Sequence, residues 1–275
     1  MSRANRGQYA EAVTGLSEGE LQDVLRVAEP PAYLLGGWAV HLQVTEGFRD
    51  THGRDYIGSR DIDLGIHVDE EWTADDITDA PVGETLERIE EKLGYSRGRF
   101  GFYQQFHRET SERLDEDQAR ALASHNVFRV DIDVIPDTTK LDAFESAFGF
   151  RPPAEPLLEP VFSDQTGDPL TEHVGWSVSE DTRIVPPAAL AAMKVRAFPD
   201  RDKSHKRLKD LADLHSVLWY VADYDGVRAA TLEQLTDEDL DIFQVAIDSD
   251  LYERTARLID VDETVLRQSI ERLAR

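Results

Sequence analysis

Two stretches of the chain decide its fold: Gly36-Gly37-Trp38-Ala39-Val40 and, farther along, Ser59-Arg60-Asp61-Ile62-Asp63-Leu64. The apolar Tyr33-Leu34-Leu35 before the glycines predicts a short strand, and the residues after the glycines predict a helix to about Gln43. In the second stretch, aspartates alternate with apolar residues. This alternation is typical of a strand that buries one face.

Each of these features has a chemical use. Glycines lack a Cβ, so the backbone at Gly36 and Gly37 can approach phosphate oxygens closely, and the N–H groups at a helix start favour anions. Aspartates at positions i and i+2 of a strand point to the same side, so Asp61 and Asp63 can ligate one hard cation. Together the two stretches predict a site for a nucleoside triphosphate with Mg²⁺ or Mn²⁺.

A second acidic strand is expected over residues 128–135, where Asp131 and Asp133 alternate with Val and Ile. Like charges this close repel each other unless a cation or a proton neutralises them. The alternative is that both are edge strands with acidic outer faces in a very acidic protein. The glycine element upstream favours the metal site. His67, on the first acidic strand, is expected to pack beside the site or to support it.

The charge balance is strongly negative. Of 275 residues, 55 are acidic and 30 basic, which gives a formal net charge of −25. An acidic surface with few lysines fits a cytoplasm of high salt, where screening removes self-repulsion, so a halophilic source is expected. The chain has no cysteine, which excludes disulfides and thiolate chemistry. The N-terminal residues 1–7 lack the apolar core of a signal peptide, and no apolar run reaches membrane-spanning length, so a soluble, cytoplasmic protein is expected.

Most of the few lysines gather in one basic segment, which offers a place for a triphosphate or a polynucleotide backbone. Its residues are Lys194, Arg196, Arg201, Lys203, His205, Lys206, Arg207 and Lys209. The alternative is a helix held by internal ion pairs, since Asp200, Asp202, Asp210 and Asp213 lie in the same stretch. Both can hold, because some of these residues can be structural and others functional.

The order of elements predicts an α+β chain with a mixed sheet and flanking helices, followed by a helical second half. The boundary is expected near residue 186, giving a catalytic domain over 1–186 and a helical domain over 187–275. A polar loop is expected over 46–58 and a proline-rich connection over 151–186 with a short strand at 182–185. Helices are expected over 17–28, 84–93, 187–198, 203–220, 231–246, 249–258 and 262–274, and turn and strand over 94–108.

These motifs resemble the nucleotidyltransferase (polymerase beta-like) superfamily, through the glycine turn, the Asp61/Asp63 strand and the acidic strand at 128–135. The segment from Leu190 to Leu214 is similar to the Lys…Arg…Lys-Asp-x-x-Asp-Leu helices of AbiEii and MenT toxin-like nucleotidyltransferases. The Gly-Gly-Trp-Ala start is also similar to small antibiotic-modifying nucleotidyltransferases. The resemblance covers residues 33–64, 128–135 and 187–214, and it is more specific for the fold than for the substrate.

The resemblance implies a role for each matching residue. Gly36 and Gly37 would cradle the triphosphate, and Asp61 and Asp63 would ligate Mg²⁺. A third carboxylate would complete the metal site and act as general base on the acceptor hydroxyl; Asp131 matches the toxin group and Asp133 the antibiotic group, and Asp131 is slightly preferred. Lys194 would neutralise phosphate charge. Ser59, Arg201 and Lys209 are further nucleotide-binding candidates.

The implied activity is Mg-dependent transfer of NMP from an NTP to an acceptor hydroxyl. The toxin-like form would act on a tRNA or protein acceptor and have a cognate antitoxin. The alternatives are a small-molecule, antibiotic-type nucleotidyltransferase, and a non-catalytic regulatory protein that holds nucleotide without transferring it.

Overall fold

The computed structural model describes residue 9 and residues 11–273. By its contacts the chain divides into two compact units, each with its own core. The sheet unit comprises Glu11–Trp38 and Gly58–Ile184. The helical unit comprises, among described residues, Tyr9, Ala39–Ile57 and 185–273. The N-terminal residues 1–7, where no export signal is expected, lie outside the described residues.

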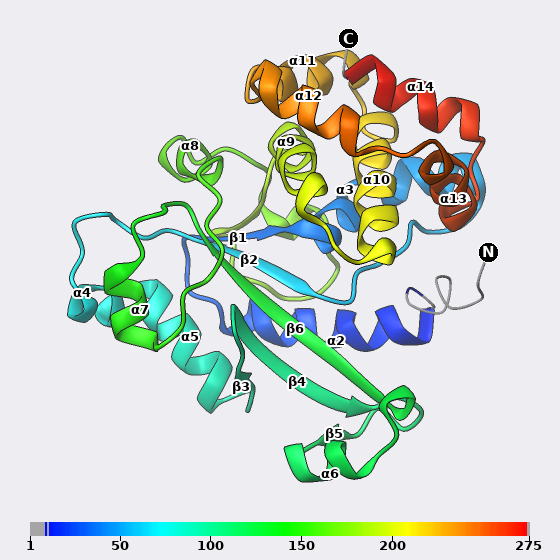
Figure 1. The fold of residues 1–275 in the computed structure, drawn as a ribbon. Helices are drawn as coiled ribbons and strands as arrows, with labels where there is room; N and C mark the ends of the chain where they lie inside the picture. Colours follow the sequence, from blue (N-terminus) through cyan, green and yellow to red (C-terminus); the bar gives the residue numbers. More distant parts are fainter. Residues whose placement is uncertain (1–8, 10, 274–275) are drawn as a thin grey trace. The chain divides into compact units, whose positions relative to one another are not determined.

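One mixed seven-stranded sheet forms the sheet unit, in the order β3-β4-β6-β2-β1-β7, with β5 paired to β4 (Figure 1). The two central strands β2 and β6 run parallel, β1 is antiparallel to β2 and parallel to β7, and β4 is antiparallel to β6. The strands are β1 Ala32–Leu35, β2 Ile62–Ile66, β3 Ser96–Arg97, β4 Gly101–His107, β5 Arg113–Leu114, β6 Val127–Pro136 and β7 Thr182–Ile184.

Strict alternation in β6 separates the two faces of the sheet. Phe128, Val130, Ile132 and Val134 are at most 1% exposed, whereas the residues between them are half-buried or exposed. Helix α2 (Glu11–Val27) contacts β6 and α5 (Pro81–Glu91) contacts α2. The remaining helices of this unit are α4 Ala74–Asp79, α6 Glu116–Ala121, α7 Asp142–Phe148 and α8 Leu158–Ser163, with 3₁₀ turns η1 Ser124–Asn126 and η2 Leu170–Glu172.

Helix α10 (Ser204–Trp219) is the centre of the helical unit and contacts α9, α11, α13 and α14. Every residue from Leu208 to Leu218 is buried, so this part of the helix has no solvent-exposed face. The other helices, yellow-green to red in Figure 1, are α9 Pro187–Ala197, η3 Phe198–Asp200, α11 Tyr224–Leu232, α12 Asp237–Ala246, α13 Ser249–Ile259 and α14 Glu263–Leu273. The predicted α+β class, with a mixed sheet, flanking helices and a helical second half, is confirmed.

The polar loop predicted over 46–58 is wrong in its first half, because α3 runs from Gly36 to His52. The ring of Phe48 is fully buried between Tyr56 and Tyr220, with ring centroids 5.3 and 4.9 Å away. Gly47 is not a loop glycine either: a Cβ there would overlap the backbone carbonyl of Tyr220. Close packing therefore explains a glycine that resembles a turn signal.

The single helix predicted over 231–246 is also wrong, since α11 ends at Leu232 and α12 begins at Asp237. Thr236 caps α12 by accepting the backbone N–H of Asp239, whose side chain accepts the N–H of Thr236 in return. The Thr-x-x-Asp signal for a new helix is thus present in the sequence. In the connection 151–186, a strand is confirmed at Thr182–Ile184, and the structure adds α8. No helix in the described part of the chain has the length and apolar character needed to cross a bilayer.

Candidate functional site

Gly36 begins α3 with φ +67°, a left-handed conformation that glycine adopts without strain. The carboxylate of Asp63 lies against it, and a Cβ at position 36 would overlap that carboxylate. Strand pairing causes the approach, because β1 places Leu35 opposite Asp63 in the antiparallel register. Negative charge is favoured at the first turn of a helix, so the start of α3 is a favourable place for the Asp63 carboxylate.

Asp133 is the register partner of Asp63 on the parallel strand β6. Both residues are half-buried, and both lie on the face opposite the buried Ile62, Leu64 and Val134. Side chains of register partners on neighbouring strands project to the same side of a sheet. The fold therefore brings together Gly36, Asp63 and Asp133.

Asp61 and Asp131 form the next row along the same face. Asp61 directly precedes β2, whose first residue Ile62 pairs with Ile132. Asp131 is ion-paired at 2.6 Å with Arg129 of its own strand. That guanidinium also lies 3.9 Å from the ring centroid of Tyr103. Arg129 therefore compensates the charge of Asp131.

The donors on this face are carboxylate oxygens, the ligand type that Mg²⁺ and Mn²⁺ prefer. Within the described residues, no group of three or more His, Asp or Glu side chains is arranged to hold a metal ion. Magnesium in nucleotide-handling enzymes is usually held by one or two carboxylates together with substrate phosphates. The pair of Asp63 and Asp133 fits that kind of site, in which the triphosphate supplies the remaining oxygens.

Two further predicted residues lie in the same unit. Gly37 is buried as the second residue of α3, and Ser59 is 8% exposed in the segment that leads into β2. Ser59 belongs to the link between α3 and the Asp63 strand, whose register is fixed by both neighbours.

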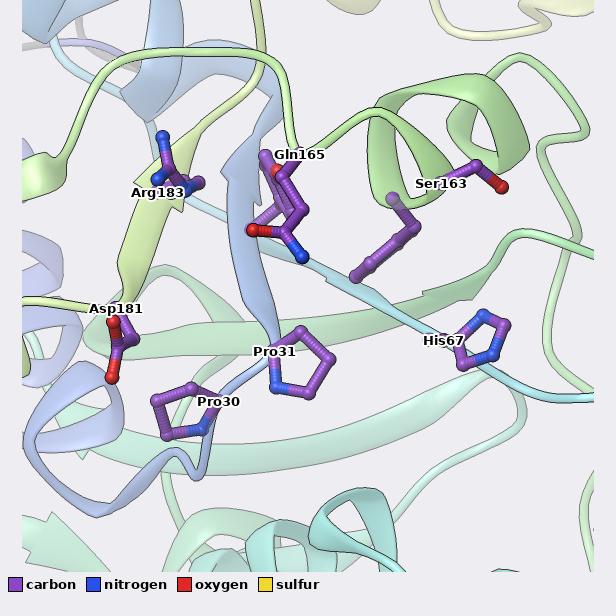
Figure 2. Close-up of a pocket in the computed structure, with 9 residues that line it drawn as sticks. Pro30, Pro31, His67, Ser163, Gln165, Asp181 and Arg183 are labelled. Atoms are coloured by element: carbon purple, nitrogen blue, oxygen red, sulfur yellow. The ribbon is translucent and has the colours of Figure 1, made fainter.

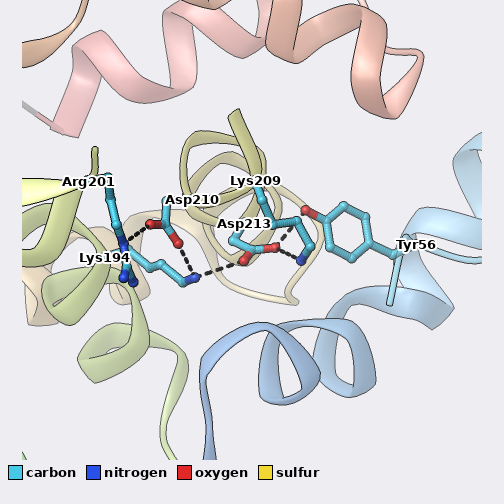
Figure 3. Close-up of polar contacts among 6 residues, drawn as sticks. All are labelled: Tyr56, Lys194, Arg201, Lys209, Asp210 and Asp213. Carbon is cyan, nitrogen blue, oxygen red and sulfur yellow. Dashed lines mark hydrogen bonds and ion pairs between the residues drawn. The ribbon is translucent and has the colours of Figure 1, made fainter. Parts of the chain in front are cut away.

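The predicted cations Lys194, Arg201 and Lys209 belong to the helical unit, where they form a buried network with aspartates (Figure 3). Lys194 on α9 donates to Asp210 and, at 2.9 Å, to Asp213, both on α10. Arg201 donates to the other oxygen of Asp210 at 2.7 Å.

Asp213 is fully buried and collects three donors. Lys209, one turn earlier on α10, donates to it, and so does the hydroxyl of Tyr56 at 2.9 Å. Lys194 supplies the third bond. The expected i,i+4 ion pair is present in Lys209 and Asp213, while the bonds of Lys194 cross between two helices, which sequence spacing alone does not reveal.

Burial and pairing compete in setting the pKa values of this network. Burial alone lowers the pKa of Lys194, but the carboxylates of Asp210 and Asp213 outweigh it and hold that pKa above its ordinary value. The pKa of Lys209 is lowered, because burial outweighs the effect of its main partner Asp213. The nearby charge of Lys194 lowers this pKa further. Burial raises the pKa of Asp210, but Lys194 and Arg201 reverse that shift and lower it.

His67 lies just beyond β2 and bonds through Nδ1 to Oδ2 of Asp137 at 2.6 Å. Its ring also contacts Trp72 and Phe162, with centroids 5.7 and 5.8 Å away. The carboxylate of Asp137 is 2% exposed and also accepts the backbone N–H of Val68 at 3.0 Å. Sequence reasoning missed Asp137, which follows Pro136 at the end of the acidic strand.

The sequence matches the model of a protein family, the nucleotidyl transferase AbiEii toxin of type IV toxin–antitoxin systems, over residues 52–273. The match includes the four aspartates of the sheet and the cations of the helical unit, and it begins after Gly36 and Gly37. No curated protein sequence matches the chain.

Among solved structures, an antigenic nucleotidyltransferase-like protein from Paracoccidioides brasiliensis is similar to the chain, with 15% identity and a TM-score of 0.36. The similarity covers 95% of this chain and 93% of that one. Assignment to a family therefore rests on the sequence match.

The match to the family model defines the chain as a nucleotidyl transferase enzyme. Since the family model covers most of its length, the chain belongs to the AbiEii nucleotidyl transferase toxin family. The resemblance drawn from the motifs is confirmed.

Proposed function

We propose that the protein transfers NMP from an NTP to an acceptor hydroxyl with Mg²⁺ bound at Asp63 and Asp133. The observation that carries this proposal is the register match of these two aspartates on parallel strands, beside the glycine that opens α3. It supplies paired oxygen ligands and a helix start for phosphate in one place. Mn²⁺ is the alternative metal.

The residues of the sheet unit have limited chemical tasks in such a reaction. The acceptor oxygen attacks the α-phosphorus, the bond to the bridging oxygen breaks, and pyrophosphate leaves. The N–H groups at Gly36 and Gly37 hold phosphate oxygens, while Asp63 and Asp133 hold the ion. When bound, Mg²⁺ neutralises charge that builds up on the phosphates. A carboxylate of β6 accepts the proton of the acceptor hydroxyl.

The choice between Asp131 and Asp133 follows from their neighbours. Asp133 is opposite Asp63, whereas Asp131 is next to Arg129 at 2.6 Å. The carboxylate of Asp63 lies against Gly36, so its register partner Asp133 is the aspartate of β6 beside the proposed phosphate site. We therefore assign the role of third carboxylate to Asp133, with Asp61 in support at the start of β2.

The helical unit supplies the remaining candidates. Lys194, Arg201 and Lys209 are proposed to neutralise phosphate charge, although their pairing with aspartates also stabilises α9 against α10. The acceptor is proposed to be a tRNA or a protein, and the toxin family implies a cognate antitoxin as partner. The net charge of −25 favours an acceptor that contacts a small part of the surface.

Replacing Asp63 by asparagine is expected to lower Mg²⁺-dependent pyrophosphate release by about 10²–10³-fold. Asparagine keeps the shape of the side chain and removes the charge that holds the ion. The measurement is pyrophosphate release from each NTP in high salt, with and without Mg²⁺. Pyrophosphate release that persists at the original rate in this variant overturns the proposed site. If the unmodified protein binds NTP but releases no pyrophosphate, the regulatory alternative is correct.

A paired comparison separates the two aspartates of β6. Asp133→Asn is expected to reduce the transfer rate by about 10²–10⁴-fold, because it removes a ligand or the base. Asp131→Asn is expected to cost less than about tenfold, since its ion pair with Arg129 is partly exposed and Asp133 stays in place. Rates of NMP transfer at saturating NTP give the comparison. The reverse order would assign the third carboxylate to Asp131.

The acceptor is identified by labelling. The protein is incubated with each α-labelled NTP and Mg²⁺, in parallel with total RNA, total protein and a panel of aminoglycosides and lincosamides. Label in the RNA or protein fraction supports the toxin-like reaction, and label in an antibiotic supports the small-molecule alternative. Asp63→Asn is the control in every arm. Labelling that is still seen with this variant does not come from this site.

A further inference from the structure

A cavity of about 490 Å³ lies in the sheet unit at the other end of β2 from Asp63 (Figure 2). His67 follows Asp63 by four residues, so strand geometry separates the two by about 13 Å. A pocket of this volume accommodates a small organic molecule. Its lining combines apolar rings with polar side chains.

Flat, fixed rings form the apolar part of the lining. Phe162 packs edge-on against Tyr33 with ring centroids 4.8 Å apart. The Tyr33 hydroxyl lies 2.9 Å from the Thr166 carbonyl, to which it donates a hydrogen bond, and this holds the ring in place. Pro30 and Pro31 form another apolar wall, seen below Gln165 in Figure 2. Such surfaces suit a planar ring.

Two of the polar groups around these walls, His67 and Arg183, are held by contacts outside the pocket. His67 is fixed through Nδ1 by Asp137, which leaves Nε2 as the nitrogen available to a ligand. Arg183 donates to the Gly167 carbonyl at 2.8 Å, which anchors its guanidinium. Figure 2 shows His67 and Arg183 on opposite sides of the cavity, so the two do not converge on one anionic group.

Gln165 is the most distinctive lining residue. It adopts φ +51°, an uncommon conformation for a residue other than glycine, in the turn after α8. Its amide points into the cavity (Figure 2), and no hydrogen bond joins that amide to another described residue. An amide offers a donor and an acceptor together, and the Asp181 carboxylate at the rim adds a further acceptor.

We propose that this cavity binds a nucleoside, with the planar base against Phe162 and the proline wall. Gln165 and Asp181 would recognise its edge. A nucleobase has flat faces and a mixed donor and acceptor edge, which matches apolar walls with dispersed polar groups. The proposal is independent of the transfer reaction, because it requires neither a triphosphate nor a metal ion.

Equilibrium dialysis with adenosine, guanosine, cytidine and uridine, in EDTA, tests the proposal on the full chain. Saturable binding of at least one nucleoside is expected. Gln165→Ala and Phe162→Ala are each expected to weaken it about tenfold, in line with the loss of one edge contact or one stacking surface. Asp164→Ala, an exposed neighbour in the same turn that does not line the cavity, is the matched control and should bind normally.

Asp63→Asn distinguishes this cavity from the transfer site, and it should leave nucleoside binding unchanged. Three results overturn the proposal: none of the four nucleosides binds, binding is lost in Asp63→Asn but not in Gln165→Ala, or inorganic phosphate displaces the nucleoside, which would indicate an anion site. Far-ultraviolet circular dichroism checks that Phe162→Ala is folded. If Phe162→Ala does not fold, Gln165→Ala still tests the proposal, because Gln165 is at an exposed position.

Discussion

Gly36→Ala is expected to lower NMP transfer by at least about 10²-fold, the scale expected when a reacting group is misplaced by about 1 Å. The new methyl group would occupy the space of the Asp63 carboxylate. The left-handed φ of +67° adds strain of about 1–2 kcal/mol for any L-residue with a side chain. Pyrophosphate release and the urea midpoint, measured on the same preparation, separate the two effects.

Gly94→Ala is the matched control for that experiment. Gly94 has φ +70° in the same unit, but a Cβ there meets no atom within 4 Å. It should therefore lose similar stability and retain its activity. If both variants lose transfer equally, or if Gly36→Ala remains fully active, the contact between Gly36 and Asp63 is not part of the active site.

Asp213→Ala is expected to lower the free energy of unfolding by about 3–5 kcal/mol, the usual loss when one partner of a buried ion pair is removed. The side chain is fully buried and accepts from Lys194, Lys209 and Tyr56. Without it, Lys209 loses its main partner, and Lys194 keeps only Asp210. Urea denaturation gives the value.

Asp250→Ala provides the surface comparison within the helical unit. Asp250 pairs with Arg254 one turn along α13 at 3.1 Å, with 60% of the acidic side chain exposed. Loss of this ion pair should lower the free energy of unfolding by at most about 0.5 kcal/mol, and the difference should disappear in high salt. The Asp213 effect should persist in high salt, because buried charges are little screened. Equal losses for the two variants would contradict the structural role assigned to Asp213.

The sequence predicts the strand placement of the four sheet aspartates, for a physical reason. Asp61 and Asp63 alternate with apolar residues, as do Asp131 and Asp133, and strand periodicity alone places each pair on one face of its own strand. The register that matches Asp63 with Asp133 could not be predicted, since it depends on pairing between segments far apart in the chain. Their roles in binding metal and substrate stay predictions.

Residues whose role depends on tertiary packing were harder to anticipate. Gly47 resembles a loop signal but permits close contact with the Tyr220 carbonyl. Spacing along the chain predicts partners for Asp210 and Asp213 within one helix, whereas Lys194 reaches them from another helix. A local sequence pattern gives the spacing of residues along one helix or strand. It does not indicate which other element packs against that helix or strand.

The parallel pairing of β2 and β6 also has a consequence during synthesis. Parallel neighbours need a long crossover, and here everything from His67 to Asn126 must be made before β6 can join β2. A nascent chain that has emerged from the ribosome only as far as β2 therefore lacks the Asp63–Asp133 pair. The carboxylate pair at this edge of the glycine turn can therefore form only after about half of the chain has been translated.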